Sequence, residues 1–218
     1  MNNLIKMNEK YAELLGLMAG DGCLSRSGGY MIYIAGHKID DLDYHQNVTK
    51  VLFKIIFEKD VKIGFRKDQL CLFIRFSDKK IFEELAKYLP IGFKYEKLKI
   101  PSEVLVKKEY FFAFVRGLVD TDGCIVFSKQ HRNYRYYPRI EITSKSKEFL
   151  LSLLLELKKN SFYGSVSHKG KKAYRLEIPG YENLKRWMES IGFSNQKHLE
   201  KIKGLLPDPL RLRAGSNR

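Results

Sequence analysis

The sequence is poor in cysteine, has fewer acidic than basic residues, and contains no long apolar run. Its three cysteines among 218 residues show no Cys-x-x-Cys spacing, which argues against a disulfide framework and a zinc site. No apolar stretch approaches the length of a membrane-spanning helix, and the start, Met-Asn-Asn-Leu-Ile-Lys, is too polar for a secretion signal. We therefore expect an intracellular protein, in cytoplasm, nucleoid or an organelle matrix, that is not secreted.

The shortage of acidic residues leaves a large positive charge. The chain has 40 Lys and Arg against 25 Asp and Glu, which gives a formal net charge of +15. Such a surplus, together with 13 tyrosines and 14 phenylalanines, favours a polyanion partner, and nucleic acid is the obvious one. An anionic membrane is the competing partner, but no basic amphipathic helix or lipidation signal supports it.

Two segments of the chain repeat each other. Residues 14–22, Leu-Leu-Gly-Leu-Met-Ala-Gly-Asp-Gly, return at residues 115–123 as Val-Arg-Gly-Leu-Val-Asp-Thr-Asp-Gly. A second marker, Ile-Gly-Phe, begins at Ile91 and again at Ile191, and its two copies have the same spacing as the first pair to within one residue. Two matches in register indicate an internal duplication into two units of equal length.

The pattern of apolar residues predicts the same order of elements in both units. The fold class expected is α+β, with two αββαββα units related by a pseudo-two-fold axis and four-stranded antiparallel sheets. The domains expected are residues 1–100, a linker at 101–108, residues 109–206 and a basic tail at 207–218. The first unit is predicted to have helices at 9–20, 40–57 (capped near Asp40 or Asp41) and 78–89, and strands at 23–26, 30–36, 61–66 and 70–76. The second unit is predicted to have helices at 111–121, 146–159 and 181–191, and strands at 125–128, 135–143, 161–168 and 171–178.

Alternation along the strands gives each sheet one apolar face and one face with basic and hydrogen-bonding groups. A single polar strand face is usually just solvated, but four such hairpins favour a surface that contacts DNA in the major groove. This assignment depends on strand parity, which a register error of one residue would invert. The residues expected to bind DNA are Ser25, Arg26, Lys62, Arg66, Arg75, Ser128, Arg135, Arg139, Glu141 and Arg175.

The repeated motif predicts a close contact between two helices that carry acids at their ends. Small residues one turn apart, Gly16 and Gly20 in one copy and Gly117 and Thr121 in the other, let two backbones approach. For one copy alone an ordinary helix crossing with an Asp-Gly cap would be the better interpretation. With two copies, Asp21 and Asp122 come together where the helix dipoles are negative, and a divalent cation between them relieves the repulsion. Oxygen ligands without a His or Cys cluster suit Mg²⁺ and phosphodiester hydrolysis.

With these motifs the chain resembles the LAGLIDADG homing endonucleases, in their single-chain form with two motifs. The resemblance implies motif helices at the interface, a saddle of two sheets over DNA, and a monomer that cuts both strands to leave short 3′ overhangs. It implies Mg²⁺ as cofactor, with Mn²⁺ substituting and Ca²⁺ binding without supporting cleavage, and metal contacts from the carboxylates of Asp21 and Asp122 and the carbonyls of Gly20 and Thr121. Polar residues after the second strand of each unit are expected beside the scissile phosphates as candidate catalytic residues: His37, Lys38, Ser144 and Lys145. A lysine there would stabilise the developing charge or orient the water, and the alternative is that Lys38 and Lys145 only contact phosphates or solvent.

The motif copies differ at one position, and two other functions stay open. Asp120 in the second copy stands where the first has Ala19. That position is not a metal ligand in the family, so Asp120 is expected to form a cap or a local hydrogen bond. The alternatives are an RNA maturase that aids splicing of its host intron, and a DNA-binding regulator that does not cleave. The Met1 start favours an intron-encoded or free-standing protein over an intein.

Overall fold

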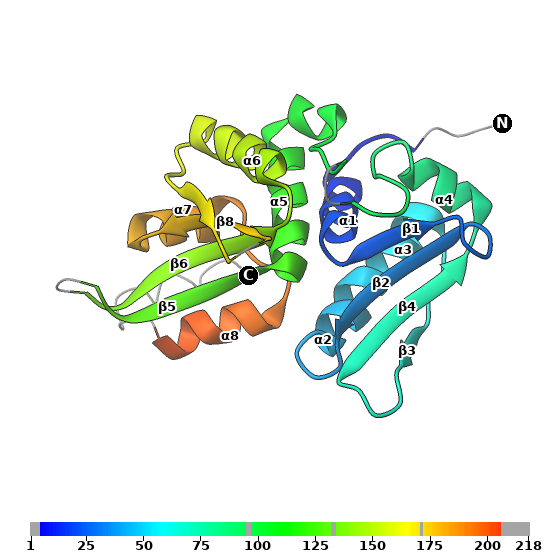
Figure 1. The fold of residues 1–218 in the computed structure, drawn as a ribbon, viewed down its shortest axis with the longest axis horizontal. Helices are drawn as coiled ribbons and strands as arrows, with labels where there is room; N and C mark the ends of the chain where they lie inside the picture. The colour runs from blue at the N-terminus through cyan, green and yellow to red at the C-terminus, as the bar shows by residue number, and fades with distance from the viewer. Residues whose placement is uncertain (1–4, 95–96, 132–133, 171, 206–218) are drawn as a thin grey trace.

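In the computed structural model, which describes residues 5–94, 97–131, 134–170 and 172–205, the chain folds into two units with the same core order of elements (Figure 1). The basic tail expected at residues 207–218 lies outside the described residues. The first unit contains α1 (Glu9–Gly20), β1 (Gly22–Ser25), β2 (Met31–His37), α2 (Leu42–Tyr44), η1 (His45–Thr49), α3 (Lys50–Phe57), β3 (Ile63–Phe65), β4 (Cys71–Ser77) and α4 (Lys79–Leu85). The second contains η2 (Ser102–Val106), α5 (Lys108–Asp122), β5 (Gly123–His131), β6 (Tyr134–Ser144), α6 (Lys147–Lys159), β7 (Ser165–His168), β8 (Tyr174–Pro179), α7 (Tyr181–Ser190) and α8 (Gln196–Leu205).

Each unit has one four-stranded antiparallel sheet, and the two sheets have equivalent strand orders. The orders are β1-β2-β4-β3 and β5-β6-β8-β7, so the second strand of each unit pairs with both the first and the fourth. The expected α+β class and the two four-stranded antiparallel sheets are thereby confirmed.

Side-chain caps fix where several helices begin. Asn8 precedes α1 and its side chain accepts a hydrogen bond from the backbone N–H of Tyr11 at 3.0 Å. Asp78 caps α4 in the same way, and Ser146 caps α6. Such caps satisfy backbone N–H groups that the first helical turn leaves without partners.

The strands bury one face and leave the other open. On β2, Ile32 and Ile34 are buried, and on β6 Ile140 and Ile142 are buried in the same way. These apolar positions pack against the helices, so the alternate positions form the face of each sheet that is turned away from the helices. We call this second face the open face.

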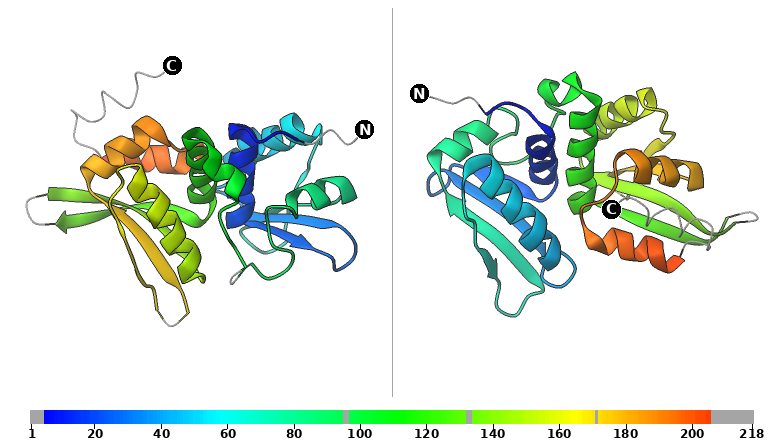
Figure 2. Two further views of the ribbon diagram at one scale, coloured as in Figure 1. Left: turned by 90° about the horizontal axis from the view of Figure 1, so that it is seen from above. Right: turned by 180° about the vertical axis from the view of Figure 1, so that it is seen from behind.

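The two units meet through their first long helices. Helices α1 and α5 run next to each other at the centre of the molecule, with one sheet on either side (Figure 2). The ends of both helices lead directly into the first strand of their own unit, because Gly22 begins β1 and Gly123 begins β5. The helix pair therefore joins the two sheets at one place.

The structure corrects several predicted elements. The helix predicted at 40–57 is interrupted by a π-helical turn, η1, and the carboxylate of Asp41 makes no cap bond for α2. The helix predicted at 78–89 ends at Leu85. The strand predicted from residue 161 begins at Ser165, because Ser161 has a positive φ of 64° that an extended strand excludes.

A helix that the sequence pattern did not indicate, α8, follows the closing helix of the second unit. It is preceded by the second Ile-Gly-Phe segment, and we call residues 191–198 the C-terminal clasp. No helix in the described part of the chain is both long and apolar enough to cross a membrane. Cys23, Cys71 and Cys124 are free and half-buried.

Candidate active site

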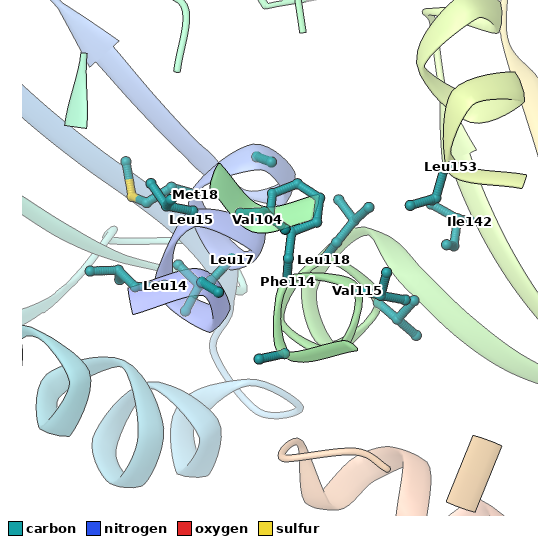
Figure 3. Packing of buried hydrophobic residues seen from close by; sticks show 14 of the residues in the cluster. Leu14, Leu15, Leu17, Met18, Val104, Phe114, Val115, Leu118, Ile142 and Leu153 are labelled. Atoms are coloured by element: carbon teal, nitrogen blue, oxygen red, sulfur yellow. The ribbon is translucent and has the colours of Figure 1, made fainter. Parts of the chain in front are cut away.

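Glycines allow the backbones of α1 and α5 to touch. A Cβ added at Gly16 would overlap the carbonyl oxygen of Phe114, and one added at Gly117 would overlap the carbonyl oxygen of Glu13. Farther along, a Cβ at Gly20 would overlap the hydroxyl of Thr121. Buried apolar side chains of both helices surround this contact (Figure 3). The crossing brings the C-terminal ends of both helices to one place.

Two carboxylates stand at these ends. Asp21 is the C-terminal cap of α1, and its backbone N–H donates to Leu17 O at 3.1 Å, while Asp122 is the last residue of α5. Burial, followed by the negative charges of Asp122 and Asp41, raises the pKa of Asp21 to about 7. Burial also raises the pKa of Asp122, although part of that residue is exposed. The negative charge of Asp122, which is exposed, thus disfavours ionisation of the half-buried Asp21.

A lysine ammonium lies at this negative site. Lys94 Nζ donates to Ala19 O at 3.0 Å and to Gly20 O, and lies 3.4 Å from Met18 O. Its positive charge opposes the effect of burial on Asp21 and Asp122, and so keeps their raised pKa from rising further. Burial lowers the pKa of Lys94 itself. The ammonium thus binds the negative end of the α1 dipole beside both carboxylates.

The Lys94 ammonium shows which atoms would surround a metal ion at this site. A cation is stabilised there by carbonyl and carboxylate oxygens, which are the ligands that Mg²⁺ and Ca²⁺ prefer. Among the residues that the structure describes there is no group of three or more His, Cys, Asp and Glu that could hold a metal. The fit to a hard divalent ion therefore depends on two carboxylates and on main-chain carbonyls, with water and phosphate as the remaining ligands.

The C-terminal clasp reaches the same end of the helix pair from the second unit. Lys197 Nζ donates to Asp41 Oδ1 at 2.7 Å, and the charge of Lys197 lowers the pKa of Asp21. Asp120 is fully buried and accepts a hydrogen bond from the backbone N–H of Ser194 at 2.7 Å. The local bond expected for Asp120 is therefore wrong, because its partner lies 74 positions farther along the chain.

The residues expected beside the scissile phosphates have other close contacts in this structure. Lys38 Nζ lies 5.6 Å from the centre of the Phe65 ring, and His37 Nδ1 lies 2.9 Å from Asp40 Oδ2. Ser144 Oγ accepts a hydrogen bond from the backbone N–H of Ser146 at 3.2 Å. Lys145 follows Ser144 between β6 and α6. Thr121 Oγ1 donates within its own helix, to Gly117 O and Leu118 O, each at 3.0 Å.

Sequence reasoning missed Lys94 and Lys197. The signal was the repeated Ile-Gly-Phe segment, whose copies carry these two lysines, but spacing alone did not show that each segment folds back to the motif helices. Folding back is a long-range contact, since Lys94 lies 74 positions from its partner Gly20.

The residues expected to bind DNA do not all lie on the open faces of the sheets. Arg75 is exposed on the open face of the first sheet, and Arg66 Nη2 reaches the hydroxyl of Tyr33 there at 3.4 Å. Arg26 instead stacks on Tyr30 and on Phe82 of α4, with its guanidinium 4.7 and 5.1 Å from the ring centres. Three others lie at or near open-face positions: Ser25, Lys62 and Ser128. Three more form ion pairs with one another: Arg139, Glu141 and Arg175. The side chain of Arg135 lies outside the described part.

Comparison with known proteins identifies the fold. Residues 109–192 match the family model described as a LAGLIDADG-like domain. The chain is 25% identical over 206 residues to the replication factor C small subunit of Methanocaldococcus jannaschii, covering 92% of this chain and 10% of that protein. It is 34% identical over 104 residues to the replicative DNA helicase DnaB of Rhodothermus marinus, covering 45% of this chain and 11% of that protein. The chain thus spans about a tenth of the length of these curated relatives.

Solved structures agree with the family model. The homing endonuclease I-DmoI in complex with DNA and Mn is similar with a TM-score of 0.60 and 21% identity, covering 84% of this chain and 96% of that one. The N-terminal LAGLIDADG domain of DUF199/WhiA is similar with a TM-score of 0.58 and 21% identity, covering 91% and 90%. The LAGLIDADG resemblance drawn from the two motifs is confirmed by the family model over residues 109–192 and, for the fold, by solved structures that cover 84% and 91% of the chain.

Proposed function

We propose that this chain, which has the LAGLIDADG fold, is a site-specific endonuclease that cuts both strands of duplex DNA with divalent ions held by Asp21 and Asp122. The observation that carries the proposal is the pair of carboxylates at the touching ends of α1 and α5, with a cation-binding position beside them. I-DmoI, whose fold this chain shares, has been crystallised with DNA in the presence of Mn, Ca or Mg.

Each part of the chain has a defined task in this proposal. The glycine contact between α1 and α5 fixes the positions of Asp21 and Asp122, so that each unit supplies one carboxylate for one DNA strand. A bound divalent ion supplies stabilisation of the negative charge on the attacking and leaving oxygens. The open faces bind the duplex on both sides of the carboxylates. The Lys94 ammonium, which binds Ala19 O and Gly20 O beside the two acids, supplies positive charge that would help to stabilise a phosphate bound there.

The finer features proposed are those of the resemblance. We propose that the protein acts as a monomer on a long asymmetric site, uses Mg²⁺ and leaves short 3′ overhangs. In support of the monomer, one chain already contains both acids and both sheets.

A second function is favoured by one specific observation. The Lys94 ammonium binds Gly20 O beside both acids, so an internal cation already satisfies the site without a metal. A protein in which this lysine stays in place would bind DNA without cutting it.

One experiment separates the two functions. The protein is incubated with a randomised duplex library in Mg²⁺, and newly formed DNA ends are captured and sequenced. The endonuclease proposal predicts ends at one sequence, with 3′ overhangs on both strands. A sequence enriched by binding, with no new ends in Mg²⁺ or Mn²⁺, would establish the non-cleaving function instead.

A further inference from the structure

The open face of the first sheet carries mostly uncharged side chains on β1, β2 and β4, and Arg66, which follows β3, reaches Tyr33 on the same face. Arg75 is the only Lys, Arg, Asp or Glu on the open face of β1, β2 and β4, three strands that the structure describes completely. Tyr33 and Phe73 stack there with their ring centres 6.2 Å apart and an angle of 18° between the rings. The Phe73 ring lies across β3, because a Cβ at Gly64 would come within 2.6 Å of that ring. Met31 and Ala35 continue this face along β2.

The open face of the second sheet carries a neutral cluster of four charged side chains. Glu141 on β6 stands directly opposite Glu177 on β8. Arg175 lies 3.0 Å from Glu177 and 3.5 Å from Glu141, and Arg139 lies 3.2 Å from Glu141 and 3.9 Å from Glu177. Two like charges opposite each other would destabilise the strand pair, so the arginines are needed to offset them.

The hydrogen-bonding groups of this cluster are only partly used. Arg139 Nε, Arg175 Nε and Glu141 Oε1 are buried and have no hydrogen-bond partner in the described structure. Because the cluster carries no net charge, it adds little to phosphate attraction. Its arginines are already oriented, and they are free to exchange a carboxylate contact for a base edge.

The two surfaces match different base pairs in the major groove. Arginine binds guanine O6 and N7 through two hydrogen bonds, and a glutamate accepts a hydrogen bond from cytosine N4. Apolar side chains instead contact the C5 methyl group of thymine. A face of Met, Tyr, Ala and Phe therefore distinguishes thymine by contact with its methyl group, while an Arg–Glu cluster distinguishes G·C pairs by hydrogen bonding.

We propose that the two sheets bind half-sites of opposite base composition, with A·T pairs under the first sheet and G·C pairs under the second. This inference rests on the proposed binding of duplex DNA and adds the chemical class of each half-site. Arg139 and Arg175 are the residues that specify guanine, and Glu141 and Glu177 orient them.

The test begins with the target sequence, obtained by selecting a randomised duplex library for binding to the whole chain in Ca²⁺. Selection is repeated with Arg175→Ala, and the positions whose preference weakens mark the half-site of the second sheet. Lys158→Ala is the matched control, because it removes one exposed charge from α6. The Arg175 variant is expected to lose preference for guanine roughly ten-fold at its position, and the Lys158 variant is expected to lose none.

The second step replaces thymine by uracil, which removes only the C5 methyl group, in one half-site at a time. Uracil in the half-site of the first sheet is expected to weaken binding several-fold, and uracil in the other half-site is expected to leave it nearly unchanged. Equal effects in both half-sites, or two half-sites of the same composition, would overturn the inference while the enriched sequence still supported DNA binding. A selection that enriches no sequence would overturn both the inference and the proposed function.

Discussion

Lys94 is the residue that balances the charge at the paired helix ends. Its ammonium contacts carbonyl oxygens of α1, and its charge offsets part of the rise that burial causes in the pKa of Asp21 and of Asp122. A divalent ion that binds the two acids must therefore share the site with Lys94 or displace it. The contact between Lys94 and the carbonyl oxygens of α1 therefore stabilises the metal-free protein and lowers its affinity for a divalent ion.

Replacing Lys94 tests this competition directly. We expect Lys94→Met to bind Mg²⁺ or Ca²⁺ roughly thirty-fold more tightly without DNA, because a lysine charge and a divalent ion about 4 Å apart repel each other by about 2 kcal/mol even in water. Titration calorimetry of the free protein measures the affinity. Lys97→Met, which removes an exposed lysine nearby, is the control and is expected to bind the ion as the wild type does. Unchanged affinity in the Lys94 variant would show that the lysine does not compete.

The sequence predicts the acids of the site but not its lysines, and the reason is physical. Asp21 and Asp122 end helices whose contact follows from the spacing of small residues. Lys94 lies in a loop and Lys197 in the first turn of α8, and where both reach the motif helices depends on tertiary packing, which a local pattern does not contain. The partner of Asp120 could not be predicted for the same reason, since its buried carboxylate binds Ser194 of the C-terminal clasp, 74 positions away in the sequence.

At the scale of elements, the contact between α1 and α5 fixes the geometry of the site. We expect Gly117→Ala to lower the free energy of unfolding by about 3 kcal/mol or more, because its Cβ overlaps the backbone at Glu13, which cannot move away as a side chain would. Chemical denaturation measures the loss. Gly204→Ala in α8 is the matched control, because its Cβ meets nothing within 4 Å. An equally stable Gly117 variant would mean that the helices do not touch.

The π-helical turn η1 buries a histidine whose effect on stability depends on pH. His45 Nδ1 lies 2.9 Å from Thr49 Oγ1, and burial lowers the pKa of His45 to about 4, while Asp41 and Lys197 act on it with opposite signs. The unfolded chain takes up a proton near pH 6.5 and the folded chain does not until about pH 4, so this histidine destabilises the fold as pH falls from 7 to 5. Asp21 and Asp120, whose pKa burial raises to about 7, act in the opposite direction.

Comparison of the wild type with His45→Gln separates the effect of this histidine from that of the buried carboxylates. When the pH falls from 7 to 5, the lowered pKa of His45 takes about 2 kcal/mol from the free energy of unfolding of the wild type, and His45→Gln is expected to be spared this loss. Urea denaturation of both proteins at both pH values measures the difference. His168→Gln, at an exposed position, is expected to keep the wild-type dependence. If the His45 variant also kept it, the histidine would be charged in the folded protein.

Most elements could be predicted because their apolar residues recur with helix or strand periods. The alternation that placed Ile140 and Ile142 inside also placed Arg139 and Glu141 on the open face. The sequence did not predict η1 or α8. A π turn keeps nearly helical periodicity, and α8 is held by few apolar residues, among them Ile202.

At the scale of the whole molecule, duplication produced a nearly symmetric frame with unequal parts. The frame supplies two acids at one contact and two sheets on either side of it. The parts differ in their open faces, and they differ again where Lys94 and the C-terminal clasp reach the helix ends. Such a molecule suits a duplex whose backbone is nearly two-fold symmetric and whose sequence is not.

The most direct test of the account is double-strand cleavage of the selected duplex in Mg²⁺ by the wild type, Asp21→Asn and Asp122→Asn. Amide side chains keep the shape of the acids but remove the negative charge that binds a cation. Each single variant is expected to lose double-strand cleavage while binding the same duplex with an affinity close to that of the wild type. A variant of either acid that still cuts both strands at the wild-type rate would contradict the account.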